Sequence, residues 1–226
     1  MSQVLVTWSK VWEQQLNSQL AIVGYGEHAR VLQAAALASG MNVVAATSLD
    51  CSVGQETGFP LVSDEELTKR WKPHEIKLIL GLGLIRADCQ DGHRKQIVER
   101  FKRLGYEFVG VRHPFSWVSA ETKIADSAQI FAGAIVQPGA TVGDFSILNT
   151  KASIDHDCTV GNFCHIAPGV TLSGSVVVQD FSHVGTGASI INGVHIGSAV
   201  TIGAGATVIR DVPDGQTVVG TPARPI

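Results

Sequence analysis

Residues 142–177 read VGDFSI LNTKAS IDHDCT VGNFCH IAPGVT LSGSVV, and every block of six begins with Val, Leu or Ile. The same class of residue occupies every sixth position from Val118 to Val208, sixteen positions without an exception. Small or compact side chains, such as Ala134 and Cys164, recur four residues later. A strict six-residue period of this length is typical of a parallel β-helix.

Three blocks of six make one triangular coil, so the 96 residues from Val118 to Pro213 predict a little over five coils. Adjacent coils lie one strand spacing apart, about 4.8 Å. Residues eighteen apart are therefore stacked neighbours, and the Ile/Leu/Val column fills the interior. The flat faces of such a prism often pack against copies of themselves, which predicts an oligomer.

The preceding residues predict a different architecture. Apolar strands at 19–23, 42–46, 77–80 and 106–111 alternate with helices at 30–39, 64–70 and 91–103. This alternation indicates a small parallel sheet covered by helices, half of a Rossmann-like fold. We therefore divide the chain into an arm at 1–19, an α/β domain at 20–112 and a β-helix at 113–226. In the arm, Trp8, Trp12 and Leu16 have helical spacing, which favours core packing over a dimer or ligand contact.

Composition excludes several functions. The net charge of −3 gives no basic surface for nucleic acid or for a membrane, and no apolar stretch reaches spanning length. The four cysteines form no CxxC pair, which suggests reduced thiols and a cytoplasmic protein. The sequence has no cluster with metal-ligand spacing, and we expect no metal.

The eighteen-residue register singles out one histidine. His156 lies in the same column as Gly174, whose bare amide could face the imidazole, and Asp155 and Asp157 flank it. A carboxylate beside an imidazole is the arrangement of a base and its orienting group. Alternatively, the histidine is solvated and the acids are ordinary corner residues.

Two further histidines, His165 and His183, are also eighteen residues apart and should stack, which favours neutral rings.

The glycines at the start of the chain form a second motif. Gly24-x-Gly26-x-x-Ala29 follows an apolar strand, and Asp50 comes about two dozen residues later. This loosely matches a dinucleotide fingerprint, but the domain is too short for that fold, and a mononucleotide half fits better. Gly81-Leu82-Gly83 follows the third strand and is either a second ligand loop or a simple buried turn.

Together these segments resemble the left-handed β-helix, hexapeptide-repeat acyltransferases, and within them the nucleotide-sugar N-acetyltransferases and sialic-acid O-acetyltransferases. The resemblance covers residues 20–226 and rests on the glycine loop, on His113-Pro114, on the segments around Asn149 and His156, and on 219–223, which reads VGTPA. It implies a left-handed β-helix, acetyl-CoA as co-substrate, and a trimer with sites between subunits.

The resemblance also implies roles for single residues. His156 matches the general base, Asp157 its orienting acid (commonly Glu in relatives), and Gly174 the amide donor near the thioester carbonyl. Residues that would bind the nucleotide-linked sugar are Gly24, Gly26, His28, Asp50, Gly81 and Asn149. Residues that would lie along acetyl-CoA are His165, Gly174, His183, Gly193, Gly205 and Pro222.

We therefore expect an acetyl-CoA-dependent N-acetyltransferase acting on a nucleotide-linked amino sugar, first a UDP-4-amino-4,6-dideoxy sugar used for surface glycans. Two alternatives stay open: O-acetylation of a free sugar such as sialic acid, and a non-catalytic β-helix that binds nucleotides.

Overall fold

A computed structural model describes residues 18–49, 57–88 and 92–226. The chain divides into two compact units. The first contains the described residues up to Leu82 together with Gln96–Val111, and the second contains the described residues of Gly83–Lys95 together with Arg112–Ile226. Within the described ranges, no helix combines the length and apolar character needed to cross a membrane.

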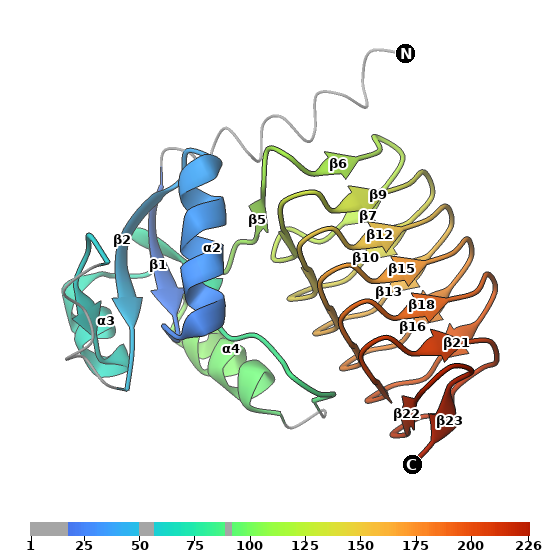
Figure 1. Cartoon of the computed structure of the whole chain (residues 1–226). Helices are drawn as coiled ribbons and strands as arrows, with labels where there is room; N and C mark the ends of the chain where they lie inside the picture. The colour runs from blue at the N-terminus through green and yellow to red at the C-terminus, as the bar shows by residue number, and fades with distance from the viewer. Residues whose placement is uncertain (1–17, 50–56, 89–91) are drawn as a thin grey trace. The chain divides into compact units, whose positions relative to one another are not determined.

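The first unit is built on a four-stranded parallel sheet in the order β3-β2-β1-β4. Its strands are β1 (Gln19–Val23), β2 (Asn42–Thr47), β3 (Leu61–Val62) and β4 (Ile76–Leu80). Helix α2 (Glu27–Ala38) packs on the sheet through a stripe of small and apolar side chains, Ala29, Leu32, Ala35 and Ala36 (Figure 1). Helix α3 (Asp64–Arg70) begins at Ser63, whose hydroxyl accepts the Glu66 N–H.

Two predicted elements differ from the structure by more than two residues. Helix α2 begins at Glu27, three residues before the predicted start, because Gly26 already serves as its N-cap. The strand predicted at 106–111 is reduced to a single bridge between Leu78 and Phe108 and to the first residue of β5 (Val111–Arg112). Gly105, in the left-handed conformation, and Gly110 bound this segment and keep the pairing short. Helix α4 spans His93–Arg103.

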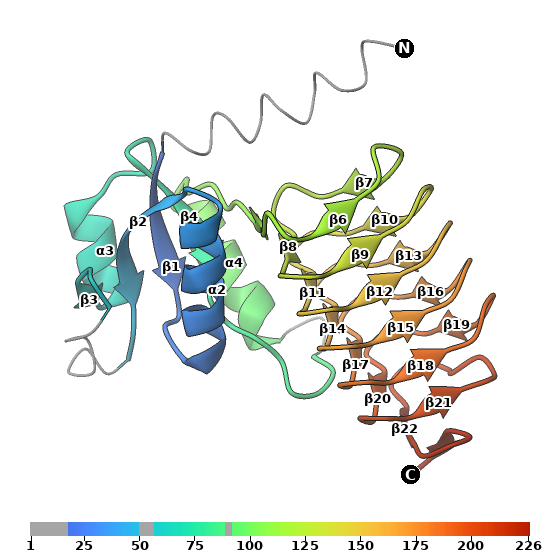
Figure 2. The ribbon, with the colours of Figure 1, turned by 45° about the horizontal axis from the view of Figure 1, so that its top comes forward.

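The second unit is a left-handed parallel β-helix whose coils are stacked in register (Figures 1 and 2). One sheet contains β5, β8 (Gln129–Ile130), β11 (Ile147–Leu148), β14 (His165–Ile166), β17 (His183–Val184), β20 (Thr201–Ile202), β22 (Thr217–Val219) and β23 (Arg224–Pro225). A second contains β6 (Trp117–Val118), β9 (Ile135–Val136), β12 (Ser153–Ile154), β15 (Thr171–Leu172), β18 (Ser189–Ile190) and β21 (Thr207–Val208). The third contains β7 (Lys123–Ile124), β10 (Thr141–Val142), β13 (Thr159–Val160), β16 (Val177–Val178) and β19 (His195–Ile196).

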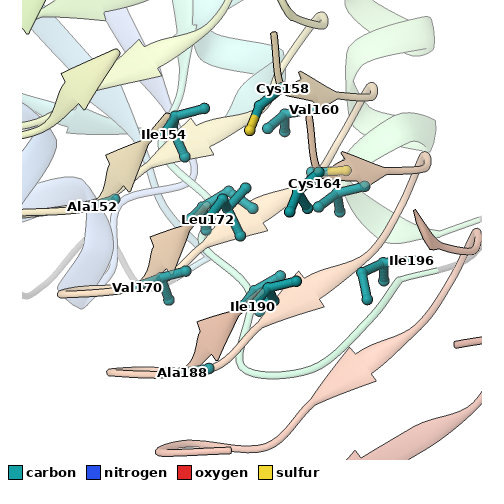
Figure 3. Packing of buried hydrophobic residues seen from close by; sticks show 14 of the residues in the cluster. Ala152, Ile154, Cys158, Val160, Cys164, Val170, Leu172, Ala188, Ile190 and Ile196 are labelled. Atoms are coloured by element: carbon teal, nitrogen blue, oxygen red, sulfur yellow. The ribbon is translucent and has the colours of Figure 1, made fainter. Parts of the chain in front are cut away.

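The interior of the β-helix is the predicted apolar column. Ile154, Leu172 and Ile190 stack on successive coils and are fully or almost fully buried (Figure 3). Cys158 and Cys164 fill compact corner positions as free thiols, and burial raises the pKa of the Cys164 thiol to about 12. These cysteines are therefore core residues, as predicted.

A segment from the first half of the chain covers one face of the β-helix. This covering segment comprises the described residues of Gly83–Lys95. The Ala87 N–H donates to Thr201 Oγ1 at 2.9 Å, and the Asp88 N–H donates to the Phe181 carbonyl oxygen at 3.0 Å. The outward-facing side chains of β8, β11, β14 and β17 in this sheet are buried, namely Gln129, Ile147, His165 and His183.

Candidate active site

The position of His156 follows from the pairing of adjacent coils. Strands β12 and β15 are parallel with Ile154 opposite Leu172, so residues eighteen apart are neighbours. His156 and Gly174 each lie two residues beyond these strands, at the corner that leads to the next sheet. The Ser175 N–H donates to the His156 carbonyl oxygen at 2.8 Å and ties the two corners together. The register predicted from the sequence is therefore confirmed.

His156 and Asp157 form a hydrogen-bonded pair in which Nδ1 lies 2.9 Å from Oδ2. An ionised carboxylate can only accept, so Nδ1 carries the hydrogen and Nε2 of the neutral ring has a free lone pair. The hydrogen bond to Asp157 is the largest cause that raises the His156 pKa above 6.5; desolvation opposes it, and the charges of Asp155 and Asp157 add to it. About 61% of the His156 side chain is exposed, so a substrate can reach it.

Gly174 leaves the space that the imidazole occupies. A Cβ at this position would lie 2.5 Å from Nε2 of His156 and 2.6 Å from Cε1. Among the residues that the structure describes, the Gly174 N–H has no acceptor, whereas its carbonyl oxygen accepts the Gly193 N–H at 3.0 Å. An unused amide donor beside an imidazole is what acyl transfer requires to stabilise a developing oxyanion.

A second polar cluster surrounds His165, which is buried. Its Nδ1 lies 2.8 Å from the Leu84 carbonyl oxygen, which can only accept, so Nδ1 carries the hydrogen. Nε2 then accepts from Asn149 Nδ2 at 3.1 Å, and Asn149 Oδ1 accepts the Thr150 N–H at 2.7 Å. These contacts fix both the tautomer of His165 and the orientation of the Asn149 amide.

His183 lies next to His165 on the following coil, as the register predicts. The rings meet edge to face, with centroids 5.1 Å apart and planes at 75°, rather than as a parallel stack. Burial lowers the His183 pKa to about 4. Its Nδ1 is buried without a hydrogen-bond partner in the described part of the chain. The ring is therefore neutral at neutral pH, as expected for adjacent imidazoles.

The two clusters do not meet within one chain. Asn149 follows β11 and His165 lies in β14, both in the eight-stranded sheet, whereas His156 follows β12 of the neighbouring sheet. One face of the prism therefore separates the proposed base from the other polar residues that the sequence assigns to the pocket.

Of the residues expected along acetyl-CoA, His165 and His183 are buried, whereas Gly193, Gly205 and Pro222 are exposed on the later coils. Gly193 lies at the same corner as Gly174, one coil on, and a Cβ at Gly193 or at Gly205 would meet nothing within 4 Å. Pro222 belongs to a tail that is fixed to the last coil, because the Ala223 N–H donates to the Thr207 carbonyl oxygen at 2.8 Å. These positions form open surface on which an extended molecule has room.

In the first unit, two glycine loops come together. A Cβ at Gly81 would lie 2.3 Å from the Gly24 carbonyl oxygen, so the loops contact each other through bare backbone. Thr47, which sequence reasoning missed, pins the first loop: its Oγ1 accepts the Gly24 N–H at 3.0 Å, and its carbonyl oxygen accepts the Tyr25 N–H at 2.7 Å. Only its place at the end of β2 could have indicated this role.

The remaining predicted sugar-site residues lie at the start of α2 or outside the described residues. Gly26 is the N-cap of α2 and has no side chain to satisfy the helix amides, and His28 lies in the first turn, half-buried. The prediction for Asp50 falls outside the described residues.

Arg94 is a second residue that sequence reasoning missed. It is almost fully buried and donates to the carbonyl oxygens of Phe145 at 2.6 Å and Phe163 at 3.2 Å. Burial lowers its pKa to about 10. Because its partners are backbone atoms far away in the sequence, no sequence pattern marks it.

No group of three or more His, Cys, Asp or Glu side chains in the described ranges has the arrangement of a metal site. A left-handed hexapeptide β-helix that carries an imidazole–carboxylate pair beside an unused amide defines the class of hexapeptide-repeat acyltransferases.

Comparisons with solved structures identify the family. The acetyltransferase domain of PglB from Neisseria gonorrhoeae is 36% identical, with a TM-score of 0.82, over 93% of this chain and 100% of that one. PerB from Caulobacter crescentus, solved with CoA and GDP-perosamine, is 30% identical with a TM-score of 0.82 over 93% and 98%. WeeI from Acinetobacter baumannii shares the fold at 21% identity and a TM-score of 0.78, over 92% and 100%.

No protein-family model and no curated protein matches the sequence. The solved structures suffice, and the chain belongs to the hexapeptide-repeat family of nucleotide-sugar N-acetyltransferases.

Proposed function

We propose that this protein transfers the acetyl group of acetyl-CoA to the amine of a nucleotide-linked sugar, first a UDP-4-amino-4,6-dideoxy sugar. The observation that carries the proposal is the contact of His156, Asp157 and the unused Gly174 amide on adjacent coils. The relatives support it, since PglB has been solved with acetyl coenzyme A and PerB with CoA and GDP-perosamine.

In this reaction His156 is the general base. Its Nε2 takes a proton from the sugar amine as the nitrogen attacks the thioester carbonyl carbon, and passes that proton to the departing CoA sulfur. Asp157 holds Nδ1–H and stabilises the imidazolium that forms. The Gly174 N–H donates to the carbonyl oxygen as it gains charge. A new amide bond and free CoA are the products, so atoms and protons balance.

Acetyl-CoA would supply the activated acyl group, and the β-helix offers a free amide donor and open corners along which this molecule could lie. The bare Gly174 amide has no other acceptor in the described ranges, and the corners at Gly193 and Gly205 are open. An extended thioester could therefore follow the coils from His156 toward the Pro222 tail.

The nucleotide is assigned to the first unit. The N-terminus of α2 has no side-chain cap at Gly26, and helix N-termini bind phosphate through free amides and the helix dipole. The contact between the loops at Gly24 and Gly81 brings bare backbone to the same place. These loops would hold the diphosphate of the sugar nucleotide, with His28 in the first turn of the helix beside it.

The assembly that completes the site is a homotrimer. This assignment is supported by the separation of His156 from the Asn149–His165 cluster of the same chain. In a trimer, the Asn149–His165 cluster of a neighbouring subunit could lie next to His156. The outer face that separates them is apolar at its first coils, where Trp117 is 52% and Ile135 is 39% exposed. Light scattering should give three times the 23.9 kDa chain mass, and a monomer would contradict the assignment.

A mass-spectrometric screen tests the function. Acetyl-CoA is incubated with UDP-, GDP- and dTDP-linked 4-amino sugars and, separately, with sialic acid. The expected result is a mass gain of one acetyl group on a nucleotide-linked sugar, fastest with the UDP sugar. Faster acetylation of a GDP- or dTDP-linked sugar would show that the nucleotide is not UDP. Acetylation of sialic acid alone, or of nothing, would refute the proposal.

A further inference from the structure

The corners of the β-helix accept side chains in the left-handed backbone conformation. Seven residues other than glycine have φ between 55° and 63° there: Phe145, Lys151, Asp157, Phe163, Ser175, Phe181 and Ala199. A glycine at such a corner is therefore not required by φ alone. The glycine corners differ in the atoms that an added Cβ would contact, and this difference distinguishes Gly139.

Gly139 has φ 76° and lies eighteen residues, or one coil, before Asp157. A Cβ at Gly139 would lie 2.3 Å from Asp157 Oδ1 and 3.3 Å from Cγ. At Gly169, Gly205 and Gly215, where φ is 68–69°, a Cβ would meet nothing within 4 Å. The Asp157 carboxylate therefore occupies the space that the missing side chain of Gly139 leaves free.

We propose that Gly139 is a positioning residue for acetyl transfer: its bare α-carbon lets the Asp157 carboxylate lie against the preceding coil, with Oδ1 on Gly139 and Oδ2 on His156 Nδ1. The main chain supports this placement, because the Asp157 N–H donates to the Pro138 carbonyl oxygen at 3.1 Å. Gly174 gives the same room to the imidazole from the following coil. Gly139 has this role only if His156 is the base, as proposed above.

Gly139→Ala should displace the carboxylate rather than the fold. Non-bonded atoms stay about 3.5 Å apart, so Oδ1 must retreat by about 1 Å, and a short side chain can do so by turning about its own bonds. The hydrogen bond between Asp157 and His156 then lengthens or breaks. The enzyme keeps its coils but loses the orientation of its base.

Loss of the hydrogen bond between Asp157 and His156 should change the pKa of His156. The charged groups that face His156 are Asp155 and Asp157 of its own corner, with the buried Cys158 thiol behind them. The corners at 137–140 and 173–176 on the adjacent coils carry no titratable side chain. Removing the hydrogen bond to Asp157 therefore moves the His156 pKa down toward its ordinary value, and a purely structural defect would not.

The test compares Gly139→Ala with Gly215→Ala, which introduces the same methyl group at a left-handed corner with nothing nearby. For both, kcat and KM are measured from pH 5 to 9 with the acceptor that the wild-type protein uses. The His156 pKa is measured separately by NMR titration without substrate. Gly139→Asn is a second variant, because asparagine tolerates the left-handed conformation yet still carries a Cβ.

The expected result for Gly139→Ala is a kcat lower by roughly tenfold to a hundredfold, as for a displacement near 1 Å, with KM unchanged. The NMR pKa of His156 and the acid limb of the rate profile move to lower pH together, and Gly215→Ala changes neither. Identical pH profiles for Gly139→Ala and Gly215→Ala would overturn the inference. An inactive wild-type protein would instead refute the proposed function, and the NMR titration would still report on Gly139.

Discussion

The substitution Gly174→Ala tests whether the space beside His156 is needed for catalysis. Its Cβ would lie 2.5 Å from Nε2 and 2.6 Å from Cε1 of the imidazole. Ordinary contact between such atoms is about 3.5 Å, so the ring must retreat by about 1 Å. Gly174 is outside the left-handed region, so alanine adds no backbone strain and the fold should be unchanged.

A displacement of about 1 Å has a known order of effect on the catalytic rate. Misplacing a catalytic group by 1 Å costs about a hundredfold in rate, which corresponds to about 2.7 kcal/mol of transition-state stabilisation. We expect kcat of Gly174→Ala to fall by about this factor, while KM for acetyl-CoA changes little because most of the other residues proposed to contact it lie on later coils.

The assay follows release of the CoA thiol with a thiol-reactive dye, at saturating acceptor, and circular dichroism checks the fold. Ser173→Ala is the matched control: it lies at the same corner, and its hydroxyl makes no hydrogen bond in the described part of the chain. A Gly174→Ala rate within about threefold of wild type, in a folded protein, would refute the assignment of this slot to the imidazole, since a 1 Å shift should cost far more.

Three further predictions follow from the charges and burial of single residues. Neutral His156 would be the active form of the proposed base, and the hydrogen bond to Asp157 raises its pKa; Asp157→Asn should therefore move the acid limb of the kcat/KM profile to lower pH while kcat falls, and an acid limb at the wild-type pH would contradict the pairing of His156 with Asp157. Burial lowers the His183 pKa to about 4 in the folded protein, against 6.5 in the unfolded chain. The stability of the folded protein is therefore unaffected by this group above pH 6.5 and decreases by about 3 kcal/mol as the pH falls toward 4. In urea titrations at several pH values, His183→Leu should show a smaller decrease in unfolding free energy than wild type, and the same pH dependence for the two proteins would refute this prediction. Arg94→Met should remove the two hydrogen bonds that the guanidinium donates to the carbonyl oxygens of Phe145 and Phe163, and should lower the unfolding free energy by about 2 kcal/mol or more; an unchanged midpoint in denaturant would show that the covering segment does not depend on these bonds.

The β-helix was predictable because its sequence period is also its spatial period. A single column of Ile, Leu and Val sets which residues stack, and a parallel ladder permits only that register once the column is buried. The neighbourhood of His156 and Gly174, and that of His165 and His183, could therefore be inferred from the spacing of residues alone. The edge-to-face meeting of the two imidazoles could not, because ring orientation depends on side-chain torsions and on the covering segment.

Contacts made through backbone atoms were not predictable. Arg94 binds carbonyl oxygens 51 and 69 residues away, and any residue type offers a carbonyl. Leu84 orients His165 through its main chain, 81 residues before it. Thr47 supports the glycine loop from the end of another strand. Such roles depend on how separate segments meet, and neither hydrophobic periodicity nor spacing encodes that meeting.

The role of Gly139 was only partly predictable from the sequence. Its place in the column next to Asp157 is readable from the sequence, but glycine is common at corners and nothing in the pattern separates it from Gly215. The direction of the Asp157 carboxylate makes the difference, and that direction is a property of the folded corner.

The proposal that His156 is the base is tested most directly by His156→Asn, assayed with acetyl-CoA and the preferred amino sugar across the pH range. General-base catalysis typically contributes 10²–10⁴-fold, so kcat should fall by about that factor, the acid limb should disappear, and acetyl-CoA binding measured by calorimetry should stay close to wild type. A variant that retains a near-wild-type rate with the same acid limb would show that another group removes the proton.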